Sequence, residues 1–375
     1  MVSTKRYMRP PPQYVHSWFA PLRSSDVVPG KITNFTFMGH ELVAFRDEND
    51  QVVVLDAHCP HFGGHLGHGL AHGVHVVDGC IRCPFHGLHF DKNGQCVKGD
   101  FVKDTGGLRH LKTTPWTVRE TLSSIFIWHG ADRTKPTREL VFTNMDFDGW
   151  TPAVTNEGRI LAPTNLFFPT ENIVDVQHFY AVHFWELNEV IRAPGEDENG
   201  AFSALLNMKW TFGAQSRFDA VRRIGQFFGS DYLFDIAVWG PGIAISRASV
   251  PMLGGATVMS VILITPTNET DCRIRVVSSV KKAYDWAPNR LLRTITGQGI
   301  EDVMARLFLW VATNDFDGDE IIWTHRKFLA NPKPLKDDGP LIAYRKWSLR
   351  FWPDDYAPAP HRERGASPQM ADAHS

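Results

Sequence analysis

Residues 59 to 87, CPHFGGHLGHGLAHGVHVVDGCIRCPFHG, are the part of the chain that most restricts its possible folds and functions. They hold three cysteines and six histidines, more metal-binding side chains than one site can use. Cys-Pro-His at 59–61 and Cys-Pro-Phe-His at 83–86 form two matched loops, in each of which an imidazole closely follows a thiolate. The pattern predicts a metal or iron–sulfur site, and the question is which residues bind.

Three interpretations compete for this stretch. A structural zinc would take the four ligands Cys59, His61, Cys80 and Cys83, which suit tetrahedral zinc. A [2Fe–2S] centre with Cys on one iron and His on the other would instead pair Cys59 and His61 with Cys83 and His86. The third possibility is buried cysteines and loop histidines with no metal. The matched loops favour the cluster, since each loop can supply one ligand to each iron.

Length and charge limit the remaining possibilities. A chain of 375 residues is long enough for two or three domains. Its 39 Lys and Arg against 41 Asp and Glu, a net charge of −2, give no broad attraction to nucleic acid or to an anionic membrane. The N-terminus has no apolar segment of a secretory signal, and no run of eighteen apolar residues occurs. We therefore expect a cytoplasmic protein without membrane insertion, and expect its clustered cysteines to bind metal rather than form disulfides.

The distribution of β and helical patterns predicts two domains and a tail. Short β runs with turns extend from about Trp18 to Trp128, and a polar connector follows at 130–142. Next come a helical segment at 171–185, closely spaced β runs that predict an antiparallel sheet, and a second helical segment at 289–315. We place the N-terminal arm and cluster domain at 1–140, a second domain at 141–352 and a disordered tail at 353–375.

The two matched loops resemble the cluster-binding loops of Rieske proteins. The resemblance implies that Cys59 and Cys83 hold an inner iron and that His61 and His86 hold an outer, more exposed iron. Cys80, Cys96 and Cys272 would then be packing residues. The interval of 21 residues between His61 and Cys83 is longer than usual in this family, and we expect the surplus to form a loop. Its additional histidines are interpreted as solvated loop residues, namely His65, His68, His72 and His75.

A second metal site is predicted in the helical segment Glu171-Asn172-x-x-Asp175-x-x-His178-x4-His183. Two imidazoles can join one carboxylate in the facial triad of non-haem iron(II) oxygenases, which leaves positions open for O₂. On a regular helix, at about 100° per residue, His183 is rotated by roughly 140° from His178. We therefore predict a π-turn or a helix break between the two histidines.

The carboxylate must come from elsewhere, and the run NDFDGDEIIWTHRK at 314–327 offers several. The segment Asp319-Glu320-Ile321-Ile322-Trp323 resembles the family's Asp-x-x-Ile-Trp element, in which the Asp is the third iron ligand. Asp319 is the preferred ligand, with Asp315 and Asp317 as alternatives. Trp323 is predicted to line the substrate pocket.

Most of the chain is therefore similar to the oxygenase component of Rieske non-haem iron oxygenases. Phe62, NIVDVQHFYAVH and DGPLIAYRKWSLRFWP are most similar to the 3-ketosteroid 9α-hydroxylase branch, and GCIRCPFHGLHFDKNGQCV also resembles aminopyrrolnitrin oxygenase. The resemblance implies an α+β fold, with an all-β Rieske domain followed by a helix-grip catalytic domain that wraps a curved antiparallel sheet around a helix. It also implies a homotrimer in which Asp175 bridges His178 to His86 of a neighbouring copy.

The implied activity is hydroxylation of an apolar, polycyclic or steroid-like substrate, with arylamine N-oxygenation and oxidative demethylation as alternatives within the family. Electrons would come from NAD(P)H through a separate reductase, directly or through a ferredoxin, because no glycine-rich dinucleotide loop is found. A different class of function, a Rieske electron carrier without catalytic iron, also remains open. Three irons per chain would indicate the oxygenase, and two would indicate the carrier.

Overall fold

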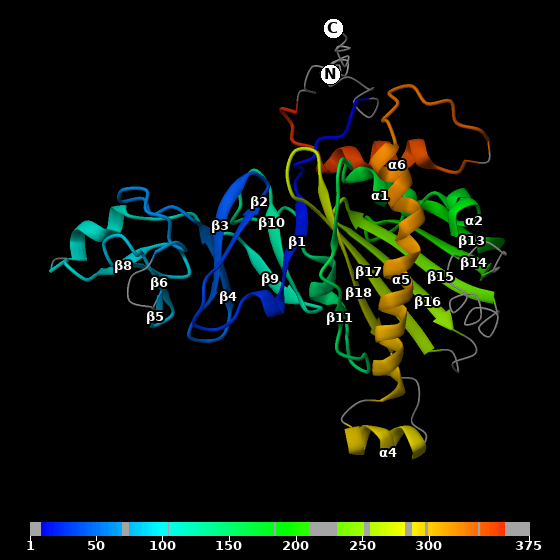
Figure 1. Ribbon diagram of the computed structural model, residues 1–375. Coiled ribbons are helices and arrows are strands. Elements are labelled where there is room, and N and C mark those ends of the chain that lie inside the picture. The colour runs from blue at the N-terminus through cyan, green and yellow to red at the C-terminus, as the bar shows by residue number, and fades with distance from the viewer. Residues whose placement is uncertain are drawn as a thin grey trace, which may run out of the picture.

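The computed structural model describes residues 9–69, 75–103, 105–183, 185–210, 231–250, 256–281, 287–296, 299–336 and 338–356. His72 and the part of the expected tail from residue 357 onward lie outside this set. Figure 1 shows a smaller β-rich part, formed by the first third of the chain, beside a broad sheet crossed by a long helix.

Short antiparallel strands make up the N-terminal part, and no α-helix occurs among its described residues. They form three small sheets, with the orders β1-β10-β9, β2-β3-β4 and β5-β6-β7-β8. The all-β prediction for this part is confirmed. The strands are β1 (Ser17–Arg23), β2 (Thr33–Phe37), β3 (His40–Arg46), β4 (Val52–Asp56), β5 (Val76–Val77), β6 (Cys80–Arg82), β7 (Leu88–Phe90), β8 (Cys96–Gly99), β9 (Val118–Thr121) and β10 (Ser124–His129), with 3-10 turns η2 (Ser24–Asp26) and η3 (Thr105–His110).

An eight-stranded antiparallel sheet forms the second part, in the order β11-β18-β17-β16-β15-β14-β13 with β12 also paired to β18. Its four successive strands β15 to β18 coincide with the β runs recognised in the sequence. The strands are β11 (Val154–Thr155), β12 (Arg159–Leu161), β13 (Trp185–Glu196), β14 (Phe202–Trp210), β15 (Asp231–Gly240), β16 (Ile243–Val250), β17 (Ala256–Pro266) and β18 (Cys272–Val280).

The helices lie mainly on one face of this sheet, and the longest, α5 (Ile300–His325), crosses over β17 and β18 (Figure 1). The two short helices α1 (Phe167–Ile173) and α2 (Val176–His183) lie on the same side. The α+β prediction is therefore confirmed. The remaining helical elements are η4 (Val141–Asn144), α4 (Ala287–Thr296), α6 (Leu341–Ser348) and η6 (Leu349–Phe351).

Both faces of the sheet are buried at β17 and β18, and the alternation along each strand assigns residues to one face or the other. Met259, Val261 and Val277 face a cluster that contains Trp18 and Trp128 of the N-terminal part. Their neighbours in sequence, among them Val258 and Val280, pack beneath α5 against Met304 and Ala305. Burial on both faces explains why β17 is almost continuously apolar and why even the polar residues of β18 are largely buried.

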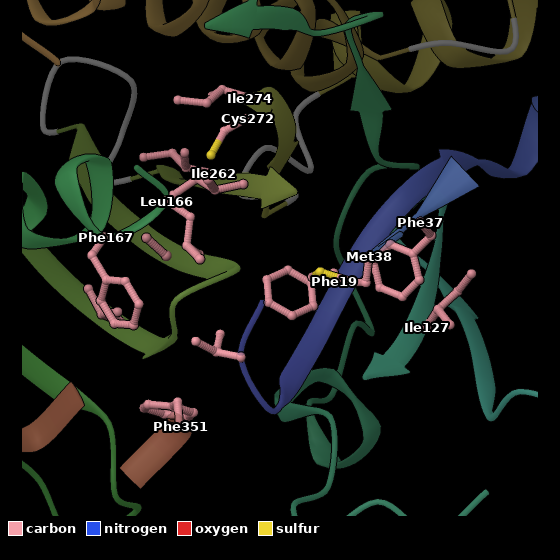
Figure 2. Packing of buried hydrophobic residues seen from close by; sticks show 14 of the residues in the cluster. Phe19, Phe37, Met38, Ile127, Leu166, Phe167, Ile262, Cys272, Ile274 and Phe351 are labelled. Atoms are coloured by element: carbon pink, nitrogen blue, oxygen red, sulfur yellow. The ribbon is translucent and has the colours of Figure 1, made fainter. Parts of the chain in front are cut away.

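A second apolar core also joins the two parts of the molecule. In Figure 2, Phe19, Phe37 and Met38 of the N-terminal part lie on one side of this core, and Leu166 and Phe351 of the second part lie on the other. The turn between β15 and β16 meets β1 so closely that a Cβ on Gly242 would lie 2.6 Å from the carbonyl oxygen of Trp18. This backbone approach requires a glycine.

We predict that Gly242→Ala loosens this junction, because the methyl group also meets the Phe19 ring and the backbone of β1 must move. Overpacking of this kind costs about 1–3 kcal/mol. The midpoint of thermal unfolding should fall by several degrees. Gly107→Ala is the control, since nothing lies within 4 Å of its Cβ position, and its midpoint should stay within about a degree. Equal midpoints for the two variants would contradict the close packing of this turn.

Candidate cluster site and metal centre

The two cysteine loops have the same backbone design. The carbonyl of Cys59 accepts a hydrogen bond from the N–H of Gly63 (2.9 Å), and the carbonyl of Cys83 accepts one from Gly87 (3.0 Å). Both glycines have positive φ, +73° and +67°, which residues with a Cβ rarely adopt. The glycines of CPHFG and CPFHG thus let each chain turn back and present its Cys and His on the same side.

The two thiols lie together in the core of the small domain, Cys59 at 3% and Cys83 at 1% exposure. A hydrogen bond from Cys59 lowers the pKa of Cys83 to about 6, and the backbone N–H groups of Phe85 and His86 act in the same direction. The same thiol–thiol bond and burial raise the pKa of Cys59, against a hydrogen bond from the N–H of His61. Backbone donors directed at both sulfurs suit thiolates that bind a metal.

The two imidazoles lie beside each other, with ring centroids of His61 and His86 4.9 Å apart. Nδ1 of His61 is buried without a hydrogen-bond partner, and a buried nitrogen of this kind needs a ligand or an ion. Among the described residues, the only group of three or more His, Cys, Asp or Glu ligand atoms within 4.8 Å of one another lies elsewhere, in the second domain. In the loops, the two thiols contact each other and the two imidazoles contact each other, which suits a group with two metals and one pair of ligands on each.

Three exposed aromatic side chains surround His86. The ring of Phe85 lies 3.8 Å from the His86 ring, with Phe62 at 6.1 Å and Phe101 at 6.4 Å between centroids. Their exposures of 74% for Phe62, 61% for Phe85 and 62% for Phe101 leave an apolar collar around the outer imidazole.

In the surplus loop, His68 is exposed, whereas His65 is half-buried and accepts the N–H of Gly67 at Nδ1 (3.1 Å).

The group in the second domain that could hold one metal ion consists of His178, His183 and Asp319. Their ligand atoms all lie within 4.8 Å of one another. The predicted π-turn or helix break between the histidines is wrong, because α2 runs unbroken from Val176 to His183. The helical segment is interrupted earlier, at Val174 and Asp175, where α1 has ended and α2 has not begun. His183 is the last residue of α2, so its ring reaches the ring of His178, 5.2 Å away, from the helix end.

The contact between Asp175 and His178 differs from the expected one. Nδ1–H of His178 donates to the backbone carbonyl of Asp175, not to its carboxylate. The carboxylate instead accepts the N–H of Gln177 (3.2 Å) at the start of α2, as a helix-capping Asp does. Burial lowers the pKa of His178 to about 4, so the ring is neutral, with Nδ1 protonated and Nε2 free to bind a metal.

Two carboxylates of α5 hold His183 between them. Nε2 lies 3.0 Å from Asp319 and Nδ1 lies 3.3 Å from Asp315. Burial alone would lower the pKa of His183, but the two carboxylates outweigh it and raise the pKa to about 10. Asp319 is only 2% exposed, and the amide of Asn172 donates to its other oxygen (2.9 Å). Of the two alternative carboxylates, Asp315 thus lies beside the site, whereas Asp317 pairs with Arg159 (2.5 Å).

A buried ion-pair network supports this arrangement and was not anticipated from the sequence. Glu171, at 3% exposure, accepts hydrogen bonds from Arg326 just after α5 and from Arg345 in α6, each at 2.6 Å. One carboxylate therefore ties α1, which precedes the histidines, to the end of the helix that carries Asp319. Removing either partner of such a pair leaves a buried charge uncompensated.

A cavity of about 170 Å³ opens directly beside the three converging residues. Its walls come from α2, α5 and strands β13 to β17, and they are mainly apolar, as Phe179, Phe234 and Phe308 illustrate. Trp323 is among the lining residues, as predicted, and is 2% exposed. An open, largely apolar space next to two histidines and one carboxylate can bring a hydrocarbon substrate to a metal.

Family comparisons agree with both sites. The Rieske [2Fe-2S] domain family matches residues 17–114, and the 3-ketosteroid 9alpha-hydroxylase C-terminal domain family matches residues 127–352. The second match alone covers more than half of the chain. This chain belongs to the Rieske oxygenases. It therefore carries a Rieske [2Fe–2S] cluster and a mononuclear non-haem iron, and it is an oxidoreductase.

Individual relatives cover nearly the whole chain. Cholesterol 7-desaturase nvd 1 of Ciona intestinalis is 26% identical over 92% of this chain and 70% of its own length. A probable 3-ketosteroid-9-alpha-monooxygenase oxygenase component of Rhodococcus rhodochrous is 26% identical over 92% of this chain and 82% of its own length. This Rieske oxygenase is thus related to enzymes named for two different oxidations of steroids.

Solved structures show the same fold at lower identity. Apo dicamba monooxygenase superimposes with a TM-score of 0.59 at 20% identity, over 90% of this chain and 97% of the other. NdmA of Pseudomonas putida CBB5 superimposes with a TM-score of 0.60 at 16% identity, over 89% of each chain. Within the described residues of this oxygenase, no helix is both long and apolar enough to cross a membrane.

Iron binding at the second site should release a proton. With a pKa of about 10, His183 is protonated at pH 7 in the iron-free site, whereas His178, with a pKa of about 4, is neutral. A metal needs both imidazoles neutral. Removal of only the mononuclear iron, followed by titration with Fe(II), should release about one proton per iron, and the affinity should rise about tenfold per pH unit from pH 6 to 9.

Calorimetry in two buffers of different ionisation enthalpy measures this proton release. Asp315→Asn is the informative variant, because it removes one of the two charges that hold the proton on His183. It should release less than one proton at pH 7 and show a flatter dependence of affinity on pH. Binding without proton release in the unmodified protein would contradict the His183 assignment.

Proposed function

We propose that this protein is the terminal oxygenase of a multicomponent system that hydroxylates an apolar, steroid-like or other polycyclic substrate. Cys59 and Cys83 would hold one iron of the cluster, and His61 and His86 the other. His178, His183 and Asp319 would hold the mononuclear iron, whose role when bound is to activate O₂ with two electrons. The observation that carries the proposal is the convergence of these three residues beside an apolar cavity.

The surrounding residues would position the reacting groups. The carbonyl of Asp175 keeps the proton of His178 on Nδ1, and Asn172 fixes the orientation of the Asp319 carboxylate. The aromatic walls would hold the substrate and exclude water from the reacting carbon. In the overall reaction, substrate, O₂, two electrons and two protons give the hydroxylated product and water.

The size of the cavity bears on the substrate. An engineered cavity of about 150 Å³ binds benzene, so a space of about 170 Å³ holds one or two rings. A tetracyclic substrate would require the walls to move apart or part of the molecule to extend beyond this space. Because a cholesterol desaturase and a ketosteroid monooxygenase are similarly related to this chain, desaturation is the second candidate reaction.

We further propose that electrons reach the iron within a head-to-tail homotrimer, from the cluster of a neighbouring copy. The reductant would be NAD(P)H, oxidised by a separate flavin reductase that acts directly or through a ferredoxin. Two exposed surfaces support this proposal: the aromatic collar around His86, and the outer side of α2, where Gln177 and Tyr180 are exposed. Asp175 begins α2 and would bridge His178 to His86 of the neighbouring copy.

The function is tested by coupled turnover. The purified protein, a surrogate ferredoxin and reductase, NADH and O₂ are incubated with a panel of steroid 3-ketones, sterols and bicyclic hydrocarbons, and the products are analysed by mass spectrometry under ¹⁸O₂. A product heavier by one ¹⁸O atom identifies hydroxylation, and loss of two hydrogens without oxygen identifies desaturation. The variant Asp319→Ala should form no product. Equal product formation by this variant would contradict the proposed iron site.

The proposed bridge is tested by Asp175→Ala and Asp175→Asn. Asn caps a helix about as well as Asp, so Asp175→Asn should preserve α2 and the iron content while it removes the negative charge. Both variants should keep the visible spectrum of the cluster and lose nearly all turnover. Single-turnover oxidation of the reduced cluster should slow to the same extent. If only Asp175→Ala is impaired, then Asp175 serves as a helix cap and the bridge assignment is wrong.

A further inference from the structure

A row of three serines crosses the sheet beneath α5, and two of them, Ser246 and Ser260, line the cavity. Ser246 of β16 lies directly opposite Ser260 of β17, and Ser260 lies directly opposite Ser278 of β18. Directly opposed residues of antiparallel strands project from the same face of the sheet. The three hydroxyls therefore share the face that α5 covers, because Val258 and Val280 of the same face pack against Met304 and Ala305 of α5.

The row interrupts an otherwise apolar surface. On the same face, Ala248, Val258 and Ile262 line the cavity next to Ser246 and Ser260. Strand interiors favour β-branched and aromatic residues, and Ser260 is the only residue of ATVMSVILITP that is neither apolar nor β-branched. Packing of the sheet therefore gives no reason for these serines.

The hydroxyls of this row also lack partners within the protein. Oγ of Ser278 is fully buried without a hydrogen bond. Ser246 and Ser260 are half-buried and line the cavity, and no described residue forms a hydrogen bond with either hydroxyl. By contrast, Ser279, which projects from the opposite face, donates to the carbonyl of Thr151 (2.8 Å). Buried hydroxyls normally find a partner, since a buried hydroxyl without a hydrogen bond loses its contact with water and gains nothing in return.

We propose that Ser246 and Ser260 bind an oxygen substituent, a hydroxyl or a carbonyl, of the otherwise apolar substrate. This inference rests on the proposed function and narrows its substrate class. The cavity then has two polar regions, the iron site on α2 and α5 and the serine pair on the sheet, with hydrocarbon walls between them. A substrate whose oxygen bonds to the serine pair is held in one orientation, so the pair determines which carbon faces the iron.

A hydroxyl can donate and accept, so the pair can bind either type of oxygen. Two such hydrogen bonds, at about 0.5–1.5 kcal/mol each, correspond to about five- to a hundredfold in affinity. A hydrocarbon of the same shape leaves both hydroxyls unpaired. A site built to hydrogen-bond a substrate group discriminates strongly against an analogue that lacks the group.

Direct binding to the intact protein, with both metal centres loaded, tests this assignment without turnover. The ligands form two matched series: 2-tetralone, 2-tetralol and tetralin, and 5α-androstan-3-one, 5α-androstan-3-ol and 5α-androstane. Calorimetry compares the unmodified protein with Ser246→Ala, Ser260→Ala and the double variant. Ser249→Ala is the control, because this residue lies on the same strand but projects from the opposite face.

In at least one series, the unmodified protein should bind the ketone or the alcohol about tenfold or more tightly than the hydrocarbon. The double variant should lose about five- to a hundredfold in affinity for the oxygen-bearing ligand, and its affinity for the hydrocarbon should stay within about twofold. Ser249→Ala should change neither. A tightly bound ligand in which the oxygen contacts Ser246 and Ser260 in a crystal structure of the complex would agree with this result.

Three results would overturn the proposal: unchanged selectivity in the double variant, an equal loss for oxygen-bearing ligand and hydrocarbon, or no binding by any oxygen-bearing ligand in either series. Failure of the proposed function gives a different result. A protein that selects oxygen-bearing ligands through the serines but forms no product in the coupled assay would retain this binding site and lose the oxygenase assignment.

Discussion

The contact between the buried carboxylate of Asp319 and His183 is the interaction on which the rest of the catalytic domain depends. At 2% exposure, this carboxylate would be costly to bury as an isolated charge. It is tolerated because His183 lies 3.0 Å away and the amide of Asn172 donates to its second oxygen. These contacts hold α1, α2 and α5 in one relative position, and the ion pairs of Glu171 with Arg326 and Arg345 further tie α1 to the end of α5 and to α6. The cavity exists because α5 is held across the sheet in this way.

The cluster domain is organised differently, by backbone rather than by buried charge. One glycine with positive φ turns each loop back, and backbone N–H groups point at the sulfurs, so the loop backbone itself orients the cysteines. The two domains share one apolar core, in which Phe19 and Phe37 lie across from Leu166 and Phe351. This shared core extends to Trp323 beside the iron site, whereas Cys59 and Cys83 of the cluster loops belong to a separate apolar core within the N-terminal part.

Much of this could be predicted from the sequence, and the reasons are local. Strands β15 to β18 were recognisable because short turns separate β-rich runs. The cluster loops were recognisable because the spacing of cysteine, histidine and glycine directly determines how each loop presents its side chains. The contacts of Asp175 were not predictable. The sequence cannot show that its carboxylate caps α2 while its backbone carbonyl accepts a hydrogen bond from Nδ1–H of His178. The predicted π-turn or helix break was wrong because His183 is the last residue of α2, and the position of that helix end depends on the strand that follows. The serine row depends on the register between three strands, which no single strand reveals.

The central claim is that one chain carries two different iron sites, and electron paramagnetic resonance of the dithionite-reduced protein tests it most directly when iron, zinc and acid-labile sulfide are quantified on the same sample. The account predicts a Rieske signal of low average g value, with about three irons and two sulfides per chain. Two irons and two sulfides in protein purified and reconstituted with excess Fe(II) would contradict the mononuclear site at His178, His183 and Asp319. Zinc in place of iron and sulfide, without the signal, would contradict the cluster.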